Sequence, residues 1–288
     1  MKDIRVGIVG AGVMGVSLAH ALTATGYDVS LYDHDAEALG RAARRMRQAG
    51  RIARLGGAGP GASVEQAGEL YCVTTLDKLG DCGVVIENVT EDPVAKEHVH
   101  RTLDDVLPAT AVVAVNTSAV SISEIALTTR HPDRVVGAHF MNPVSQSTMV
   151  EVIATPYAAS WALETMQRLI RTAGKESVVV SDATGFVINR CLMIFINEAA
   201  ALLDDGVATP HAVDRLFRGC LGHRTGPLRT ADIIGIDTIV HTLNVLSRAY
   251  GPARFTPSAR LRQMVDEGHL GYKSGRGFYS YVTEGDEK

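Results

Sequence analysis

The first fifteen residues constrain the fold of this chain more than any other stretch. Residues 4–9 form a short apolar run, I-R-V-G-I-V, and three glycines follow at once in the pattern G-A-G-V-M-G: Gly10, Gly12 and Gly15. An apolar stretch, 16–22, then leads to a second apolar run, 27–32, which ends at Asp33. This pattern predicts a strand, a glycine turn, a helix and a second strand that closes on an acid.

Each part of this pattern suits the binding of a dinucleotide. Gly10 permits a tight turn, Gly12 lets the backbone approach a pyrophosphate, and Gly15 lets the helix pack closely on the strand. The helix N-terminus, which begins near Val13 and Met14, offers unpaired N–H groups and a partial positive charge to the phosphates. Asp33 lies 18 residues beyond Gly15, where a carboxylate can accept from both ribose hydroxyls and would repel a 2′-phosphate. We therefore expect NAD, rather than NADP, to bind at Gly10, Gly12, Val13, Met14, Gly15 and Asp33.

The composition is that of a globular enzyme with no basic footprint. The chain of 288 residues is long enough for two domains, and 46% hydrophobic with 21% charged residues is an ordinary proportion. A net charge of −4 and a pI near 6.2 argue against nucleic acid as a partner. No apolar run approaches the roughly 18 residues that a membrane helix needs, and Met1 leads directly into a strand. We expect a cytoplasmic protein that does not contact a membrane.

The four cysteines show no C-x-x-C spacing. We therefore predict reduced, mostly buried thiols and no metal site. The cysteines are Cys72, Cys82, Cys191 and Cys220.

Apolar runs alternate with helical patterns through the first two thirds of the chain. Further strands are expected at 70–74, 83–88, 111–115, 135–138, 150–153 and 177–180, with helices at 36–55, 93–107 and 161–173. This alternation predicts an α/β domain with a Rossmann-type doubly wound sheet over residues 1–184. From Gly185 the pattern is helical, with helices expected at 186–203, 211–220, 230–250 and 258–267. We therefore expect an all-α C-terminal domain over residues 185–288.

Polar side chains follow three of the expected strands. In chain order they are Glu91 with Lys96, then Asn116 with Thr117 and Ser118, then H-F-M-N-P at residues 139–143. Ligands of a doubly wound sheet bind beyond the carboxyl ends of its strands. We therefore expect the active site at this edge.

A dehydrogenase that oxidises an alcohol needs a base for the hydroxyl proton, and histidine suits this role because it titrates near neutral pH. His139 lies at a strand end, and Glu151 follows twelve residues later. A strand, a turn at 142–143 and a returning strand can place this carboxylate against the imidazole, where it would fix the tautomer as the acid of a catalytic triad does. The alternative is that His139, like the other nine histidines, has a structural role.

The chain resembles the L-3-hydroxyacyl-CoA dehydrogenase family over nearly its full length. The resemblance is carried by the glycine turn with Asp33 and by five further motifs: V-I-E-N-V-T-E-D-P-V-A-K, N-T-S-A-V-S-I-S-E-I-A, R-V-V-G-A-H-F-M-N-P, T-G-F-V-I-N-R, and the closing L-G-Y-K-S-G-R-G-F-Y. It implies that His139 is the catalytic base and Glu151 its partner. It also implies that Ser118 contacts the substrate oxygen and the nicotinamide side, and that Asn189 lies near the substrate carbonyl. The remaining implied cofactor contacts are Glu91, Lys96, Asn116, Asn142 and Lys273.

The chain departs from the family pattern in three places. A glycine-rich stretch, 56–62, stands where the family has a helical hairpin with a serine and a lysine that hold the CoA nucleotide. Phe140-Met141 replaces a double phenylalanine, and C-L-G-H-R-T-G-P-L-R-T replaces the M-G-P-F-E-L region. These features resemble a bacterial branch that acts on carrier-protein thioesters, in which a glyceryl group is oxidised during the synthesis of alkoxymalonyl extender units for polyketides. A divergent CoA site is the equal alternative.

The predicted function is therefore NAD-dependent interconversion of a 3-hydroxyacyl thioester, on CoA or on an acyl carrier protein, and its 3-oxoacyl form. The family resemblance also implies a homodimer formed through the helical domain. Two alternatives are a 3-dehydrogenase of a free sugar acid and a non-catalytic NAD-binding protein. Six arginines in the fourteen residues 41–54, with no acid among them, suit either a solvated helix face or the acidic surface of a carrier protein.

Overall fold

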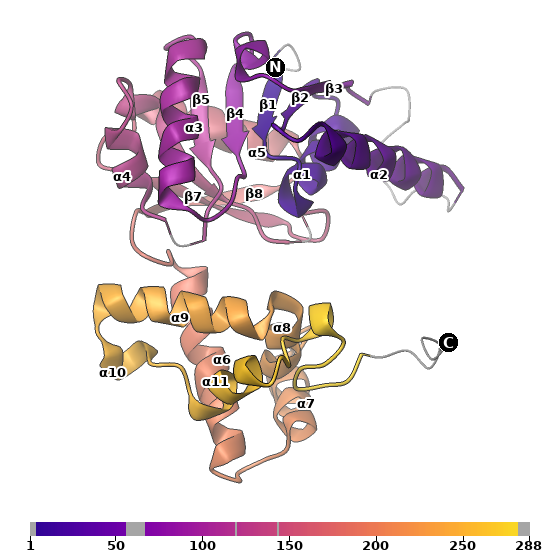
Figure 1. Ribbon diagram of the computed structural model, residues 1–288, viewed down its shortest axis with the longest axis vertical. Helices are drawn as coiled ribbons and strands as arrows, with labels where there is room; N and C mark the ends of the chain where they lie inside the picture. The colour runs from indigo at the N-terminus through magenta and orange to yellow at the C-terminus, as the bar shows by residue number, and fades with distance from the viewer. Residues whose placement is uncertain (1–3, 56–66, 119, 143, 282–288) are drawn as a thin grey trace. The chain divides into compact units, whose positions relative to one another are not determined.

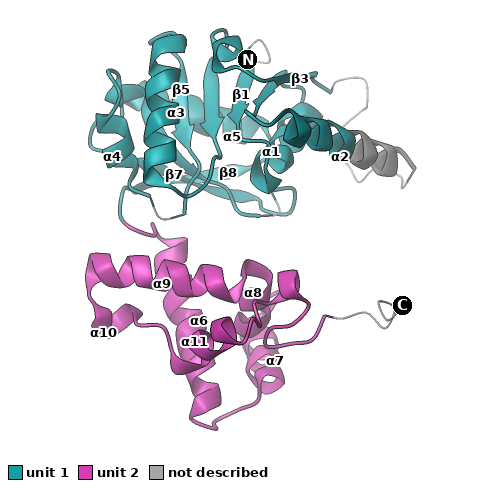
Figure 2. Ribbon diagram, viewed as in Figure 1, with its two compact units in different colours: residues 1–183 teal, residues 184–288 magenta. Residues whose placement is uncertain are grey.

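The computed structural model describes residues 4–55, 67–118, 120–142 and 144–281, with the backbone alone from residue 47 to residue 55. The glycine-rich stretch 56–62 lies outside the described residues. The chain forms two compact units, residues 1–183 and 184–288, coloured teal and magenta in Figure 2. In the described part of the chain, no helix is both long and apolar enough to span a membrane.

The first unit is built on an eight-stranded sheet in the order β3-β2-β1-β4-β5-β6-β7-β8 (Figure 1). The strands are β1 (Val6–Val9), β2 (Val29–Tyr32), β3 (Leu70–Val73), β4 (Val84–Glu87), β5 (Val112–Val115), β6 (Val135–His139), β7 (Met149–Ala154) and β8 (Glu176–Ser181). Every residue of β1, β4 and β5 is buried, as expected for central strands covered on both faces. The strand order reverses direction at β1 and β4, and the predicted doubly wound sheet is confirmed.

The sheet is mixed rather than wholly parallel. Strands β1 to β6 pair in parallel, whereas β7 runs antiparallel to β6 and carries β8 parallel to itself. The pairing of β6 with β7 sets His139 directly opposite Glu151. The carboxyl ends of β1, β4, β5 and β6 therefore share one edge with the start of β7.

Helices cover both faces of this sheet. They are α1 (Val13–Ala24), α2 (Ala36–Leu55), α3 (Pro93–Val106), α4 (Ile122–Leu127) and α5 (Ser160–Thr172). Buried side chains of α1 and α5, such as Leu18 and Met166, share one hydrophobic core with β1, β2 and β4. Figure 1 shows α3 in front of the sheet and α5 behind it. The short helix α4 is not among the helices predicted from the sequence.

The second unit is helical, as predicted. Its helices are α6 (Ile188–Asp204), α7 (Pro210–Leu221), α8 (Pro227–Ile234), α9 (Ile236–Tyr250), α10 (Pro252–Phe255) and α11 (Ala259–Asp266). The prediction of one helix over 230–250 is wrong, because Gly235 adopts φ +105° and separates α8 from α9. The core of this unit centres on residues such as Ile196, Leu228 and Leu243.

The prediction that the cysteines are mostly buried is also wrong. Only Cys82, beneath β1, is buried, whereas Cys72, Cys191 and Cys220 are exposed. Cys72 lies on the edge strand β3, and the other two thiols lie on outer faces of α6 and α7. A cysteine behaves as a small apolar side chain, and its position on an element, which the sequence alone does not give, decides its exposure.

Candidate active site

The acid at the end of β2 is held in place by backbone N–H groups. Asp33 Oδ2 accepts from the Ala11 N–H at 2.7 Å, and Oδ1 accepts from the Asp35 N–H at 2.9 Å. Its side chain is 15% exposed and lines a cavity of about 360 Å³ together with Gly12 and Val13. The carboxylate is therefore fixed, yet it keeps an open side from which to accept ribose hydroxyls.

The turn between β1 and α1 cannot carry larger residues at two of its glycines. Gly10 has φ +101°, and a Cβ at Gly15 would lie 1.8 Å from the Gly10 carbonyl oxygen. Gly12 caps α1 without any side-chain hydrogen bond, and the next residue, Val13, is 64% exposed. The first-turn N–H groups therefore face the cavity side uncapped, which fits a pyrophosphate. Met14, half-buried, packs against the sheet core.

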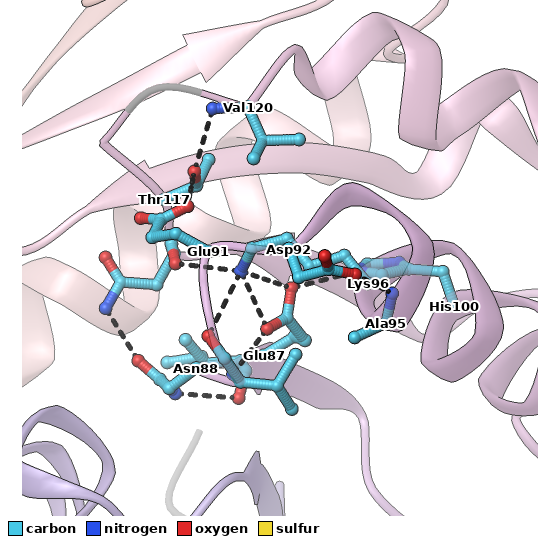
Figure 3. Close-up of polar contacts among 12 residues, drawn as sticks. Glu87, Asn88, Glu91, Asp92, Ala95, Lys96, His100, Thr117 and Val120 are labelled. Atoms are coloured by element: carbon cyan, nitrogen blue, oxygen red, sulfur yellow. Dashed lines mark hydrogen bonds and ion pairs between the residues drawn. The ribbon is translucent and has the colours of Figure 1, made fainter. Parts of the chain in front are cut away.

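The loops that follow β4 and β5 are joined by side-chain contacts (Figure 3). Glu91 Oε2 accepts from the Thr117 hydroxyl at 2.5 Å, and Oε1 accepts from the Ser118 N–H at 2.8 Å. The Asn116 amide donates to Asn88 Oδ1 at 2.6 Å. These contacts bring together two of the polar clusters predicted at this edge of the sheet.

The third cluster meets them through His139. Its Nδ1 lies 2.7 Å from Glu151 Oε2, with the two side chains 5% and 9% exposed. Its Nε2 lies 3.3 Å from Ser118 Oγ. A carboxylate only accepts hydrogen bonds, so this geometry puts the ring proton on Nδ1 and leaves the Nε2 lone pair toward Ser118. Asn142 is exposed just beyond β6, and Pro143 lies outside the described residues.

Lys96 lies beneath these loops rather than at their surface. It is fully buried on α3, and its ammonium donates to both carboxylate oxygens of Glu87, at 2.9 and 3.0 Å. His100, one helical turn further along, also contacts Glu87, with its Nε2 at 3.3 Å. The predicted contact between Lys96 and a cofactor stays a prediction, because no surface of its side chain is accessible in this conformation.

Comparisons with known proteins identify the family. Residues 5–183 match the model described as 3-hydroxyacyl-CoA dehydrogenase, NAD binding domain, and residues 185–281 match that family's C-terminal domain. The chain belongs to the 3-hydroxyacyl-CoA dehydrogenase family. It is an NAD-dependent oxidoreductase of that family, and the cavity, the uncapped helix N-terminus and the fixed acid described above fit this cofactor.

Relatives match over nearly the whole chain. A Bacillus subtilis protein named probable 3-hydroxybutyryl-CoA dehydrogenase is 36% identical over 284 residues, which is 98% of each chain. The solved structure of M. tuberculosis FadB2 covers 96% of this chain and 99% of its own, with 33% identity and a TM-score of 0.91. That of (S)-3-hydroxybutyryl-CoA dehydrogenase from Ralstonia eutropha covers 98% and 100%, with 32% identity and a TM-score of 0.89.

Two residues implied by the family resemblance belong to the helical unit. Asn189 is half-buried in the first turn of α6. Lys273 donates to Asp237 at 2.6 Å within the same unit. The roles predicted for Asn189 with the substrate and for Lys273 with the cofactor therefore stay predictions. Near Asn189, the exposed side chains of Val187, Ile188 and Cys191 line a mostly apolar cavity of about 500 Å³.

The arginine-rich helix α2 is only partly described. Arg41 pairs with Asp35 and Glu37, at 3.2 and 3.5 Å. Arg45 lines the cavity beside Asp33 and a second cavity of about 390 Å³, which His20 also lines. The side chains of Arg47, Arg51 and Arg54 lie outside the described residues, as does the loop that follows them.

The sequence did not reveal two members of the site. Glu87 and Asn88, at the end of β4, reach Lys96 and Asn116 respectively. A signal was present for Glu87: it is the only charged residue in a strand that is otherwise apolar and fully buried. No comparable signal marked Asn88, because an asparagine after a strand is common in turns.

Proposed function

We propose that this protein oxidises the 3-hydroxyl group of a 3-hydroxyacyl thioester to a 3-oxo group, and catalyses the reverse reaction. The observation that carries the proposal is the arrangement of Glu151, His139 and Ser118, which lie in line at 2.7 and 3.3 Å at the carboxyl edge of the sheet. A base oriented by a buried acid, next to a hydroxyl that can hold the substrate oxygen, is what alcohol oxidation requires.

In the proposed mechanism, His139 Nε2 takes the proton of the substrate hydroxyl. Glu151 accepts from Nδ1–H throughout, and its charge stabilises the imidazolium that forms. Ser118 Oγ, next to Nε2, orients the substrate oxygen. Asn189 is proposed to contact the substrate carbonyl. Bound NAD would supply the acceptor for the hydride of the substrate carbon.

We assign the cofactor contacts as follows. Asp33 accepts from the adenosine ribose, and the backbone from Gly10 to Gly15, including Gly12, Val13 and Met14, holds the pyrophosphate. The nicotinamide half is proposed to meet Glu91, Asn116, Ser118, Asn142 and Lys273. Glu91 already accepts two hydrogen bonds from the Ser118 loop, so it would orient that loop toward the ring.

The test is NADH formation from (S)-3-hydroxybutyryl-CoA, the type of substrate named for the relatives. The unmodified protein should turn over, and H139Q should lose about 10²–10⁴-fold in kcat, which is typical when a positioned base is removed. NAD affinity should change little, because His139 ends β6, which lies four strands along the sheet from β2, the strand that Asp33 follows. Near-normal turnover in H139Q would rule out the assigned base.

We propose CoA as the carrier of the thioester, because the relatives are named as CoA dehydrogenases and because Arg45 lines the second cavity of about 390 Å³, where it offers a cation to a phosphate. An acyl carrier protein, possibly bearing a glyceryl group, is the second candidate. The observation that favours it is the exposed basic face at Arg41, Arg44 and Arg45, which could steer an acidic partner.

One comparison decides between the carriers. The same short 3-hydroxyacyl group is offered on CoA and on a carrier protein, at low and at moderate salt. Docking of a carrier protein predicts a higher kcat/KM for that form, lost as salt rises and lost in R44E/R51E. The matched control is R101E/R168E, which reverses the charge of two exposed arginines on α3 and α5. Equal use of CoA without salt dependence settles the carrier as CoA.

We also propose that the protein is a homodimer formed through the helical unit. Val187, Ile188 and Cys191 are exposed beside an apolar cavity, and soluble proteins usually cover such patches. Sedimentation at micromolar concentration should give the mass of two chains. A fully active monomer under those conditions contradicts this assembly.

A further inference from the structure

Three ionisable side chains are buried together beneath the catalytic loops. Glu87, at the last position of β4, is 0% exposed; Lys96 is 0% and His100 is 1% exposed, and both come from α3 (Figure 3). Burial alone would raise the pKa of Glu87, but the hydrogen bond from His100 and the charge of Lys96 hold it below its ordinary value. The cluster is therefore an ion pair between Lys96 and Glu87, with His100 hydrogen-bonded to the same carboxylate.

Such a cluster is a poor way to stabilise a fold. Removing two charges from water costs several kcal/mol per ion, and apolar side chains of similar volume often serve stability equally well. In addition, His100 Nδ1 is a buried nitrogen without a hydrogen-bond partner among the described residues. The arrangement of these residues thus points to a requirement other than stability.

The Lys96 ammonium also reaches the two loops above it. Its Nζ lies 3.5 Å from the Val89 carbonyl oxygen and 3.5 Å from the Asn116 carbonyl oxygen. Its three N–H bonds are therefore shared among four oxygens, which belong to the end of β4, the loop after β4 and the loop after β5. Glu87 adds a second contact with the first loop, because its Oε1 accepts from the Val89 N–H at 2.5 Å.

The two loops held in this way carry the groups that surround His139. The loop after β4 carries Glu91, which accepts from Ser118 N–H, and the loop after β5 carries Ser118 itself, 3.3 Å from His139 Nε2. Asn116 also accepts, through Oδ1, from the N–H of Phe140, the residue next to His139. The contacts of Lys96 and Glu87 with these loops therefore help to fix the position of Ser118 relative to the imidazole.

We propose that Lys96 is a positioning residue: its ammonium, neutralised by Glu87, fixes the loops after β4 and β5 so that Ser118 is aligned with His139. This role rests on the proposed function of His139 and Ser118. His100 donates to Glu87, and among the described residues no hydrogen bond joins its ring to either loop.

The test uses the double variant K96M/E87Q, which removes the ammonium without leaving an unpaired buried charge. It should fold as the unmodified protein does, and its turnover is measured at saturating NAD. Its kcat should fall by roughly 10²-fold, the loss expected when a reacting group is misplaced by about 1 Å, with a much smaller change in KM. K96M alone should lose as much kcat and also lose stability, because Glu87 is then unpaired.

Two control variants of α3 distinguish the misplacement of Ser118 from a general loss of fold stability. H100F removes the second side chain that contacts Glu87 and leaves the contacts of Lys96 with both loops in place, so its kcat should stay near that of the unmodified protein. L103A opens a cavity at a fully buried site and should lower Tm without lowering kcat at a temperature well below Tm. If H100F or L103A loses as much kcat as K96M/E87Q, or if K96M/E87Q keeps its turnover, the positioning role is overturned.

A second measurement does not depend on turnover. The ¹⁵N resonances of the His139 ring report the hydrogen bonds at Nδ1 and Nε2. In K96M/E87Q the Nε2 resonance should move as the contact with Ser118 changes, whereas in H100F it should not. Unchanged Nε2 in the double variant overturns the proposal even if the unmodified protein oxidises no 3-hydroxyacyl thioester, so the two failures can be told apart.

Discussion

Replacing Glu151 by glutamine separates the charge of this side chain from its shape. The sheet register that sets Glu151 opposite His139 does not depend on the side chain, so E151Q should keep the fold. The neutral amide can still accept from Nδ1–H through its oxygen. What is lost is the negative charge beside an imidazole that becomes cationic as it takes the substrate proton.

The size of the loss follows from the geometry. The 2.7 Å contact is nearly buried, and a hydrogen bond to a charged group contributes about 1.5–3 kcal/mol. An attraction of about 4 kcal/mol between unit charges 4 Å apart, at an effective dielectric constant of 20, sets an upper figure that applies only to complete proton transfer. The smaller range corresponds to roughly a 10- to 150-fold lower kcat. If the amide rotates and donates to Nδ1, the tautomer is reversed and the loss is larger.

The assay is steady-state NADH formation at saturating NAD, with E176Q as the control. Glu176 is exposed on the neighbouring strand β8, so E176Q removes the same charge without touching His139. E151Q should lower kcat while KM for NAD stays unchanged. A turnover for E151Q equal to that of E176Q would refute the reasoning, because it would mean that no charge develops on His139 against this carboxylate.

Three further predictions follow from other contacts. D33S should weaken NAD binding and narrow its advantage over NADP, seen as the ratio of the two Kd values; equal affinities in the unmodified protein would contradict the role of Asp33. Burial raises the pKa of the Cys82 thiol to about 12, so at pH 8 a thiol reagent should modify the exposed cysteines of the native protein and spare Cys82. Burial raises the pKa of Glu87, but His100 and Lys96 more than offset this and hold the pKa below its ordinary value of 4.5. Ionised Glu87 therefore contributes fully to the free energy of unfolding above pH 4.5, and this contribution is lost as the pH falls through the lowered pKa. The single tryptophan, Trp161 on α5, should report this acid unfolding of the first unit, and E87Q/K96M should abolish that part of the pH dependence.

The sequence predicted the sheet and the helical half because their signals are local. Short apolar runs with turn residues between them identify buried strands, and the switch to helical periodicity after Gly185 identifies the second half. The helix expected over 230–250 failed for an equally local reason: the apolar pattern continues through Gly235, whereas the backbone there takes a φ that no helix has. A glycine inside a helical pattern can lie within one helix or separate two helices, and the sequence alone does not distinguish these cases.

The sequence predicts which residues meet at the ends of neighbouring strands, but it does not predict how deeply a side chain is buried. Two residues twelve apart, His139 and Glu151, were expected to meet because a strand, a turn and a returning strand allow it, and β6 and β7 place them opposite each other. Lys96 was expected to contact the cofactor at the carboxyl edge of the sheet, but its side chain is fully buried, which is rare for a lysine. Its burial is decided by how α3 packs on β4, and nothing in the local sequence reports that packing.

The two ring nitrogens of His139 are held by different parts of the fold. Nδ1 is fixed by Glu151 through the pairing of β6 with β7, and Nε2 faces Ser118, whose loop rests on Lys96. If both supports act by orienting the same ring, loss of either one frees it, and loss of the second then costs less than it does alone. The variant E151A removes the acceptor at Nδ1 as well as the charge. The kcat of E151A combined with K96M/E87Q should therefore exceed the value expected from multiplying the separate losses, since residues that act as a unit are not additive. Losses that multiply would instead mean that Glu151 acts only through its charge and that Lys96 acts elsewhere than on the imidazole.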